Sequence, residues 1–296
     1  MARLWVLGAP DPEMEAIEVL LSDAKETVAY ATVNGQRCHP GNAYRSSCEA
    51  ARGFSGTVYE VECRVDVLHG SATESIDSDA NVVTVDHHRP GDPGYGRPPA
   101  EFLAASSIGQ VLRAMDLPST PHIAMVAAAD HCLGAAYRGE CPGIDPAELA
   151  RFRAAERARN QRRTVDEVMR DINATTAALA AAGLLTLGCD RTVRDMRTCY
   201  VCDGRGGACG ADETAGYDGP CHCGPRGPWP ELPEAATRVG VGYISGPLAG
   251  PDGRRKITCS GTAEQVRAFI DFWARSQGLL DVYGDPGRGF AGGYLP

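Results

Sequence analysis

The chain of 296 residues lacks the long apolar runs of a membrane protein, since no stretch approaches the ~20 residues that a membrane-spanning helix needs. Residues 1–7 form too short an apolar stretch for a secretory signal peptide. Hydrophobic residues make up 43% and charged residues 23%, as in ordinary soluble globular proteins. We therefore expect a cytoplasmic protein with no membrane partner.

Positive charge is also in short supply, because 29 lysines and arginines stand against 38 acidic residues, for a net charge of −9. Binding to long duplex nucleic acid is driven largely by neutralisation of phosphates. The charge balance therefore argues against such a partner. It is compatible with a small phosphorylated substrate, or a short single-stranded oligonucleotide, because a metal ion or local arginines can supply positive charge.

Apolar patterns alternate between the periods of strands and helices in the first half of the chain. Helices are expected after Pro12 and over residues 101–115. Ile123–Ala129 is wholly apolar, like a buried parallel strand. The expected strands are residues 3–8, 27–33, 57–63, 81–85 and 123–129. This alternation predicts an α/β domain over residues 1–145, a parallel sheet with helices on both faces.

The rest of the chain divides into three further segments. Two helices, 146–160 and 164–182, predict a helical connector over residues 146–188. Residues 189–230, rich in cysteine, glycine and proline, form an insertion. Residues 231–296 predict a small C-terminal α+β domain, with strands at 238–244 and 254–260, a helix at 262–277 and a glycine-rich loop at 283–296.

Acidic and imidazole side chains lie at or just past the carboxyl ends of four of the expected strands. They are Asp11 and Glu13, Glu62, Asp86 with His87 and His88, and Asp130 with His131. Because the carboxyl ends of parallel strands meet at one edge of a sheet, we expect these side chains to lie together. Carboxylates with an imidazole suit Mn²⁺, with Mg²⁺, Co²⁺ and Zn²⁺ as rivals. Two such ions ~3.5–4 Å apart could clamp a phosphoryl group and activate water for its hydrolysis.

Four segments that carry these residues resemble, in their order along the chain, the motifs of the DHH phosphoesterases. This family includes RecJ-like exonucleases, nano-RNases, cyclic-dinucleotide phosphodiesterases and family II inorganic pyrophosphatases. The segments are GAPDPEMEAIEVLL (8–21), VYEVEC (58–63), VTVDHH (83–88) and IAMVAAADH (123–131). The resemblance covers roughly residues 1–145. It implies the metal ligands Asp11, Glu13, Glu62, His87 and Asp130. It also implies that His88 contacts the scissile phosphate, while Asp86 would orient the imidazoles.

The chain departs from the family pattern at three positions. Leu7 stands where the family usually has a metal-binding histidine, and Glu13 and Glu62 stand where aspartate is usual. One of two metal sites could thus be reshaped or absent. Asp66 is the alternative to Glu62, and Asp66 or His131 could compensate for Leu7. A hydrogen-bonded buried histidine is nevertheless the simpler interpretation of His131.

The resemblance also implies a smaller C-terminal domain that holds the rest of the substrate. The segment GRGFAGGY, residues 287–294, would place Arg288 and backbone N–H groups near a phosphate or carboxylate, because glycine lets a backbone approach a ligand closely. The match to the family's usual Gly-Gly-Gly-His loop is loose, since this segment has no histidine. A flexible chain terminus is the competing interpretation.

Five of the 12 cysteines fall within residues 199–223, in a segment with little apolar content. A CxxC pair followed some twenty residues later by a second cluster is zinc-ribbon spacing. The expected ligands of a structural Zn²⁺ are Cys199, Cys202, Cys221 and either Cys223 or Cys209, with His222 as a spare. Such a loop would depend on its metal for folding.

These patterns predict a metal-dependent phosphoesterase that acts on a small phosphorylated compound, most simply a nucleotide or short oligonucleotide. His88 and Arg288 would neutralise phosphate charge in the transition state. Two alternatives stay open. One is the same fold with another reaction at a single metal ion; the other is a non-catalytic module that binds a nucleotide or a protein. The oligomeric state is open as well, and a homodimer is compatible with the sequence.

Overall fold

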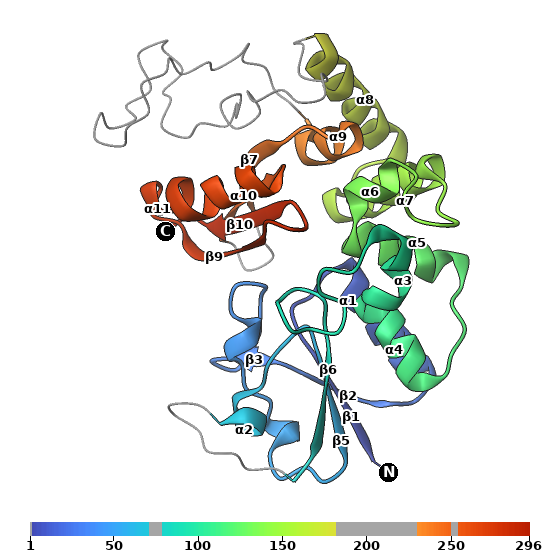
Figure 1. Ribbon diagram of the computed structural model, residues 1–296, viewed down its shortest axis with the longest axis vertical. Coiled ribbons are helices and arrows are strands. Elements are labelled where there is room, and N and C mark those ends of the chain that lie inside the picture. Colours follow the sequence, from blue (N-terminus) through green and yellow to red (C-terminus); the bar gives the residue numbers. More distant parts are fainter. Residues whose placement is uncertain (1, 71–78, 182–229, 250–253) are drawn as a thin grey trace. The chain divides into compact units, whose positions relative to one another are not determined.

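The computed structural model describes residues 2–70, 79–181, 230–249 and 254–296, with side-chain detail for most of them (Figure 1). The chain forms two compact units, Met1–Glu156 and Arg157–Pro296. Within the described ranges, no helix is both long enough and apolar enough to cross a membrane. The expected zinc ligands of the cysteine-rich insertion lie outside these ranges, so that prediction stays open.

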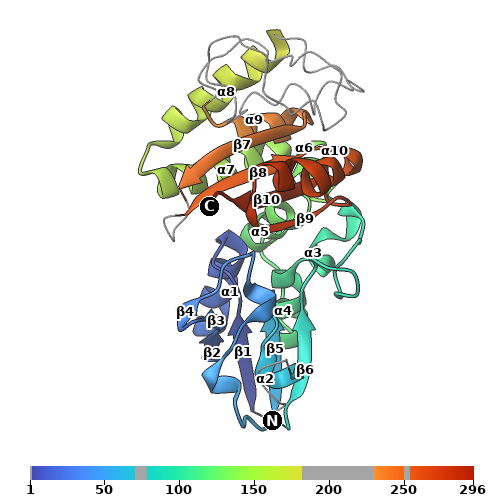
Figure 2. The ribbon, with the colours of Figure 1, turned by 90° about the vertical axis from the view of Figure 1, so that its left-hand side faces the viewer.

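The first unit is built on a parallel sheet of four strands in the order β2-β1-β5-β6 (Figure 2). The strands are β1 (Arg3–Leu7), β2 (Thr27–Tyr30), β5 (Thr57–Val61) and β6 (Asn81–Val85). Leu7, Val61 and Val85 lie level with one another across the three neighbouring strands, so the strands end together. From β1 the chain passes first to β2 on one side and then crosses to β5 and β6 on the other side. The strand order therefore reverses between β1 and β5, which is where open α/β sheets bind ligands.

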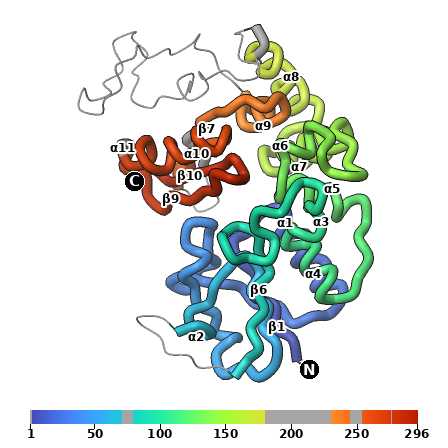
Figure 3. Tube along the Cα trace, viewed as in Figure 1, coloured from blue at the N-terminus to red at the C-terminus, as the bar shows by residue number. Residues whose placement is uncertain are grey.

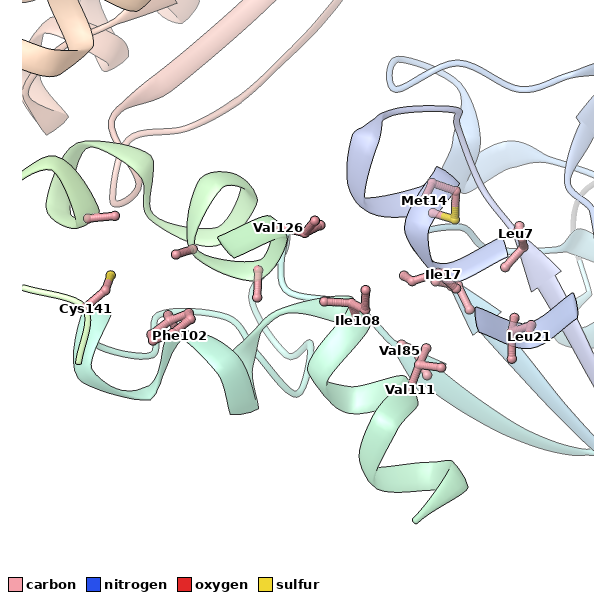
Figure 4. Close-up of a cluster of buried hydrophobic side chains, with 14 of the residues drawn as sticks. Leu7, Met14, Ile17, Leu21, Val85, Phe102, Ile108, Val111, Val126 and Cys141 are labelled. Atoms are coloured by element: carbon pink, nitrogen blue, oxygen red, sulfur yellow. The ribbon is translucent and has the colours of Figure 1, made fainter. Parts of the chain in front are cut away.

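Alternate residues of β1 face two different cores. Trp5 and Leu7 pack against three helices: α1 (Pro12–Asp23), α4 (Ser107–Met115) and α5 (Pro121–His131) (Figure 4). Leu4 and Val6 face the core formed with the short helical turns η1 (Ala43–Arg45), η2 (Glu49–Ala51) and α2 (Asp66–His69). Both faces of the sheet are covered. The predicted α/β class with a helix-flanked parallel sheet is confirmed.

Helix α1 begins where the sequence signals it. The Asp11 side chain accepts a hydrogen bond from the Met14 N–H at 2.7 Å and so caps the helix, and Pro12 occupies the first turn, where its missing N–H costs nothing. Met14, Ile17 and Leu21 are fully buried on the face that meets the sheet. This short connection sets the acidic residues Asp11 and Glu13 at the end of β1.

The predicted strand 27–33 is interrupted. Strand β2 ends at Tyr30, and Thr32–Val33 (β3) pairs instead with Gln36–Arg37 (β4) in a small hairpin. Asn34 and Gly35 at its tip have φ of 52° and 76°, as a two-residue turn with left-handed backbone requires. Asn34 and Gly35 thus form the turn of this hairpin, and the prediction of a continuous strand is wrong.

The predicted strand 123–129 is wrong, because this segment lies within helix α5. The Thr120 side chain accepts a hydrogen bond from the Ile123 N–H at 3.2 Å, and Pro121 opens the first turn. A short apolar run cannot by itself distinguish a buried helix from a buried strand. Here the cap and the alanines, which favour helix, decide the outcome.

The predicted helix 101–115 is broken into α3 (Phe102–Ala105) and α4 by Ser106, whose side chain caps α4 through the Gly109 N–H at 3.1 Å. The short helix α6 (Leu133–Tyr137) follows α5, and α7 (Pro146–Gln161) spans the boundary between the units. The predicted helix 164–182 corresponds to α8 (Val165–Ala181). Thr164 and Glu167 exchange side-chain-to-backbone hydrogen bonds at its start and so form a capping box.

The second unit carries an antiparallel sheet in the order β7-β8-β10-β9. Its strands are β7 (Tyr243–Ala249), β8 (Arg255–Ser260), β9 (Leu280–Asp285) and β10 (Phe290–Tyr294), accompanied by α9 (Leu232–Val239) and by the consecutive turns α10 (Ala263–Ala268), η5 (Phe269–Trp273) and α11 (Ala274–Ser276). The predicted strand at 254–260 and helix at 262–277 are present. The predicted strand 238–244 begins only at Tyr243, because α9 continues to Val239 and ends at Gly240, where φ is 70°.

The glycine-rich tail is strand rather than loop, which corrects the prediction for residues 283–296. Ala291 and Tyr294 are buried in β10, and Gly292 lies against the Tyr283 ring of β9. A Cβ at Gly292 would come within 2.6 Å of the Tyr283 hydroxyl oxygen. Glycine therefore serves close packing inside the sheet here, rather than freedom of the backbone.

Candidate metal centre

Glu13 is held at the end of β1 by the start of another helix. Its side chain is buried, and its Oε1 atom accepts a hydrogen bond from the Ile108 N–H in the first turn of α4 at 3.0 Å. The amino end of a helix favours a carboxylate, because its N–H groups are otherwise unsatisfied. The second oxygen, Oε2, is buried and accepts no hydrogen bond from the described residues. It is therefore available to a cation.

Glu62 follows β5 in a conformation that is unusual for a glutamate, with φ of 51°. Left-handed backbone costs a non-glycine residue roughly 1–2 kcal/mol. The neighbouring chain is adapted to it, since a Cβ at Gly8 would come within 2.5 Å of the Glu62 carbonyl oxygen. Glu62 Oε1 is buried and, like Glu13 Oε2, accepts no hydrogen bond from the described residues. Strain of this kind is typical of functional positions.

Asp86, directly after β6, organises the two histidines that follow it. Its Oδ1 atom accepts hydrogen bonds from the His87 N–H at 2.6 Å, the His88 N–H at 3.0 Å and, with the appropriate tautomer, the His88 Nδ1 at 2.9 Å. Its Oδ2 atom accepts from the Tyr44 hydroxyl at 2.8 Å. With both oxygens engaged, Asp86 positions the imidazoles and is not placed as a metal ligand.

The backbone around Asp86 is fixed as firmly as its side chain. The buried Gln110 side chain donates to the Asp86 carbonyl at 2.9 Å and accepts from the Asp86 N–H at 3.2 Å. The loop then folds back, and Gly94 packs so closely that a Cβ there would lie 2.6 Å from the Cβ of His87. His87 is consequently buried completely.

Three carboxylates converge on His87 Nε2. The nearest oxygens are Asp130 Oδ2 at 3.0 Å, Glu62 Oε1 at 3.3 Å and Glu13 Oε2 at 3.6 Å. Asp130 comes from the last turn of α5, a helix that packs against α1 and α3 (Figure 3). Atoms of Glu62, His87, His88 and Asp130 that can bind metal all lie within 4.8 Å of one another. This cluster can hold a metal ion.

His131 determines how His87 faces the carboxylates. The His131 Nε2 atom lies 3.3 Å from the Arg97 carbonyl oxygen, which can only accept, so Nε2 donates. In a neutral His131 the other nitrogen, Nδ1, then accepts from His87 Nδ1 at 2.9 Å. A neutral His87 that donates from Nδ1 presents the lone pair of Nε2 to the carboxylates. In this tautomer, a cation between the Nε2 lone pair and the carboxylate oxygens would relieve their mutual repulsion.

The acidic residues also perturb one another. Burial, followed by the charges of Glu62 and Asp130, raises the pKa of Asp11 well above its ordinary value. Burial and then the charges of Asp130 and Glu62 raise the pKa of Glu13 in the same way. Burial alone would also raise the pKa of Glu62, but the nearby histidines outweigh it and leave this pKa lowered. Neighbouring carboxyl groups whose pKa values are shifted in opposite directions are typical of functional sites.

Not every predicted site residue reaches the cluster. Asp11 caps α1 with Oδ1 and interacts with Glu62 and Asp130 through its charge. Asp66 starts α2 and is absent from the metal-compatible group of described residues, whereas Glu62 belongs to it. Leu7 is buried in the core beside Met14 and Ile17 (Figure 4). Arg288 belongs to the second unit, where its guanidinium lies 5.0 Å from the Phe290 ring centre, and its role at a substrate stays a prediction.

Two histidines beside His87 complete the comparison with the sequence prediction. His88, expected to contact substrate, belongs to the same metal-compatible group as His87, and its role at a substrate stays a prediction. His131 is buried and hydrogen-bonded, as its simpler interpretation holds, but its partner is His87 itself. The supporting residues Tyr44 and Gln110 carry no sequence signal, because each is distant along the chain from Asp86.

Comparisons with known proteins return no significant match among protein-family models, curated proteins or solved structures. The resemblance to the DHH phosphoesterases therefore stays a prediction that rests on the quoted motifs.

Proposed function

We propose that this protein is a metal-dependent phosphoesterase of the DHH type, which hydrolyses a small phosphorylated substrate, most simply a nucleotide or short oligonucleotide. One observation carries the proposal: the buried His87 Nε2 faces carboxylate oxygens of Asp130, Glu62 and Glu13 at 3.0–3.6 Å. Burying this much negative charge without a counter-charge is costly. Protons neutralise part of this charge in the metal-free protein, and a bound divalent cation would neutralise it with the carboxylates ionised.

The donor set fits such an ion. Two buried carboxylate oxygens, Glu13 Oε2 and Glu62 Oε1, accept no hydrogen bond from the described residues. Carboxylate oxygen combined with imidazole nitrogen favours Mn²⁺, Co²⁺ or Zn²⁺, while Mg²⁺ prefers oxygen alone. Glu62, His87 and Asp130 would hold the ion, with Glu13 completing its shell. Mn²⁺ is our choice among these metals.

When bound, a divalent ion supplies Lewis-acid polarisation of a phosphoryl oxygen and lowers the pKa of water. The chain itself contributes position and charge. The Asp86 carboxylate holds the His88 ring through Nδ1, which leaves the other nitrogen of His88 to meet a phosphate. His88 is partly exposed, whereas His87 is fully buried. This difference suits His87 to a structural role at the metal and His88 to a role at the substrate.

A single ion is the form that the structure favours within this proposal. Leu7, which replaces the family's histidine, has its side chain in the apolar core and offers no ligand. The metal-compatible group spans less than 5 Å, a set compact enough for one ion. Elemental analysis distinguishes a one-ion site from a two-ion site. It should find one Mn-class ion per chain in the first case and two in the second, in addition to the zinc predicted for the cysteine-rich insertion.

Hydrolysis assays test the function. Bis-p-nitrophenyl phosphate and a dinucleotide should be cleaved with Mn²⁺ present and left intact after chelation, and His87→Ala should lose the activity. His122→Ala is the matched control, because His122 is an exposed histidine on the same helix as Asp130. Turnover that survives chelation or His87→Ala would contradict the proposal. If nothing in a broad panel is cleaved but one phosphorylated compound raises the Tm, the non-catalytic binder is correct.

A further inference from the structure

Two cysteines next to the metal cluster lie in contact with each other. The Sγ atoms of Cys132 and Cys141 are 3.1 Å apart, about 1 Å more than the ~2.05 Å of a disulfide bond. Cys132 directly follows His131 and precedes α6, and Cys141 lies in the loop after α6. A hydrogen bond of 3.0 Å from the Glu140 N–H to the Ala135 carbonyl turns this loop back toward Cys132.

The other described cysteines have a different environment. Cys38, Cys48, Cys63 and Cys259 are buried among apolar residues. Burial raises the pKa of Cys38 to about 11 and that of Cys259 to about 12, which makes these thiols unreactive. By contrast, the hydrogen bond with Cys132 lowers the pKa of Cys141. Cys132 is partly exposed, so a reagent can reach one thiol of the pair.

We propose that Cys132 and Cys141 form a reversible disulfide by exchange with a small-molecule disulfide. The Cys132 thiolate attacks one sulfur of the reagent, which forms a mixed disulfide and releases one reagent thiolate. The Cys141 thiolate then attacks the Cys132 sulfur, which closes the Cys132–Cys141 bond and releases the second reagent thiolate. The two thiol protons of the protein pass to the two released thiolates, and two electrons pass from the protein to the reagent.

A bond between Cys132 and Cys141 would form directly beside the candidate metal centre. Cys132 is two residues from Asp130, so the bond would tether the carboxyl end of α5 to the loop that follows α6 (Figure 3). This segment would then be a redox-sensitive part of the first unit. The proposal is covalent and does not rest on the proposed function, and its test needs neither metal nor substrate.

The test is peptide mass spectrometry on the native, full-length protein. The reduced protein is equilibrated with oxidised glutathione, quenched with acid, alkylated and digested with trypsin without reduction. Trypsin cuts after Arg138, so peptides 114–138 and 139–151 each carry one cysteine of the pair. The linked pair of peptides should accumulate, and an excess of reduced glutathione should remove it. Cys63, buried in the other core, should stay unmodified under the same conditions.

Two variants define the order of events. Cys141→Ser should trap one glutathionyl group on Cys132, because the resolving thiol is gone. Cys132→Ser should leave Cys141 unmodified, since Cys141 is only 2% exposed. Absence of the linked pair from the native wild-type protein in excess oxidised glutathione overturns the proposal, whether or not Cys132 takes up glutathione. Linkage that forms only in urea overturns it as well.

Discussion

His87 Nδ1 lies 2.9 Å from His131 Nδ1, and the far nitrogen of His131 lies 3.3 Å from a backbone carbonyl. With both rings neutral, donation from His131 Nε2 to this carbonyl makes His131 Nδ1 the acceptor for His87 Nδ1, and the lone pair of His87 Nε2 then faces the carboxylates. A hydrogen-bond partner behind a metal-binding histidine commonly contributes 10–100-fold to metal affinity. The candidate metal site thus extends at least one residue beyond its predicted ligands.

His131→Leu should weaken Mn²⁺ binding by about 10–100-fold, because the variant cannot accept a hydrogen bond from His87 Nδ1. His131→Gln, whose side-chain oxygen can accept, should recover part of the loss. Isothermal titration calorimetry measures both affinities. His122→Leu, on the exposed part of the same helix, is the control. Equal affinities for wild type and His131→Leu would show that His131 does not position His87.

Glu13→Gln should raise the Tm of the metal-free protein by about 2–4 °C near neutral pH. The raised pKa of Glu13 means that the folded state holds its proton more tightly than the unfolded state does. The wild-type protein therefore loses stability as pH rises from the ordinary carboxyl range through the raised pKa. The glutamine keeps the hydrogen bond from the Ile108 N–H without the charge.

The same Glu13→Gln variant should gain less Tm from added Mn²⁺ than the wild type does. Differential scanning fluorimetry over a pH series measures both effects, and the stability gain should shrink toward acid pH. Glu15→Gln, exposed on the same helix, should change neither quantity. A wild-type protein that is more stable than Glu13→Gln in metal-free buffer at neutral pH would contradict this account.

Asp86→Ala should destabilise the protein by about 3 kcal/mol or more, because several hydrogen-bond donors would lose their acceptor. Tyr44→Phe, which removes one of these hydrogen bonds, should cost about 1 kcal/mol.

The contribution of Asp86 to stability should also depend on pH. Burial raises the pKa of Asp86, but the hydrogen bonds from His88 and Tyr44 outweigh it, so this pKa is lowered. The contribution of Asp86 should therefore be present above the ordinary aspartate pKa and disappear as pH falls through the lowered one. Urea unfolding at several pH values checks the trend; a cost for Asp86→Ala that does not change with pH would refute it.

Gly8→Ala should lower stability by about 1–3 kcal/mol and weaken Mn²⁺ binding, because its Cβ would press on the Glu62 carbonyl and displace that residue. Gly134→Ala is the matched control. Its Cβ would meet only the Arg138 side chain at 3.6 Å, and alanine favours the helix in which it lies. Thermal unfolding and metal titration of the two variants should give opposite signs for stability. A tolerated Gly8→Ala with normal metal affinity would contradict the predicted coupling between Gly8 and Glu62.

Much of the first unit could be predicted from its sequence. Asp86, His87 and Glu62 sit at strand ends, where the carboxyl edge of a parallel sheet gathers them, and Asp11 is recognisable as a helix cap before Pro12. The type of element that positions Asp130 could not be predicted, because the apolar run Ile123–Ala129 has no periodicity that distinguishes a helix from a strand. The contacts of His131, Tyr44 and Gln110 could not be predicted either, since tertiary packing alone brings them together. In the tail, glycine marked close strand packing rather than a loop.

The most direct test of the central claim is anomalous X-ray scattering at the manganese edge from crystals soaked in Mn²⁺. The account predicts a peak at ~2.0–2.4 Å from oxygen or nitrogen atoms of Glu62, His87 and Asp130. No peak at that position, under saturating Mn²⁺ and with the side chains arranged as described, would contradict it.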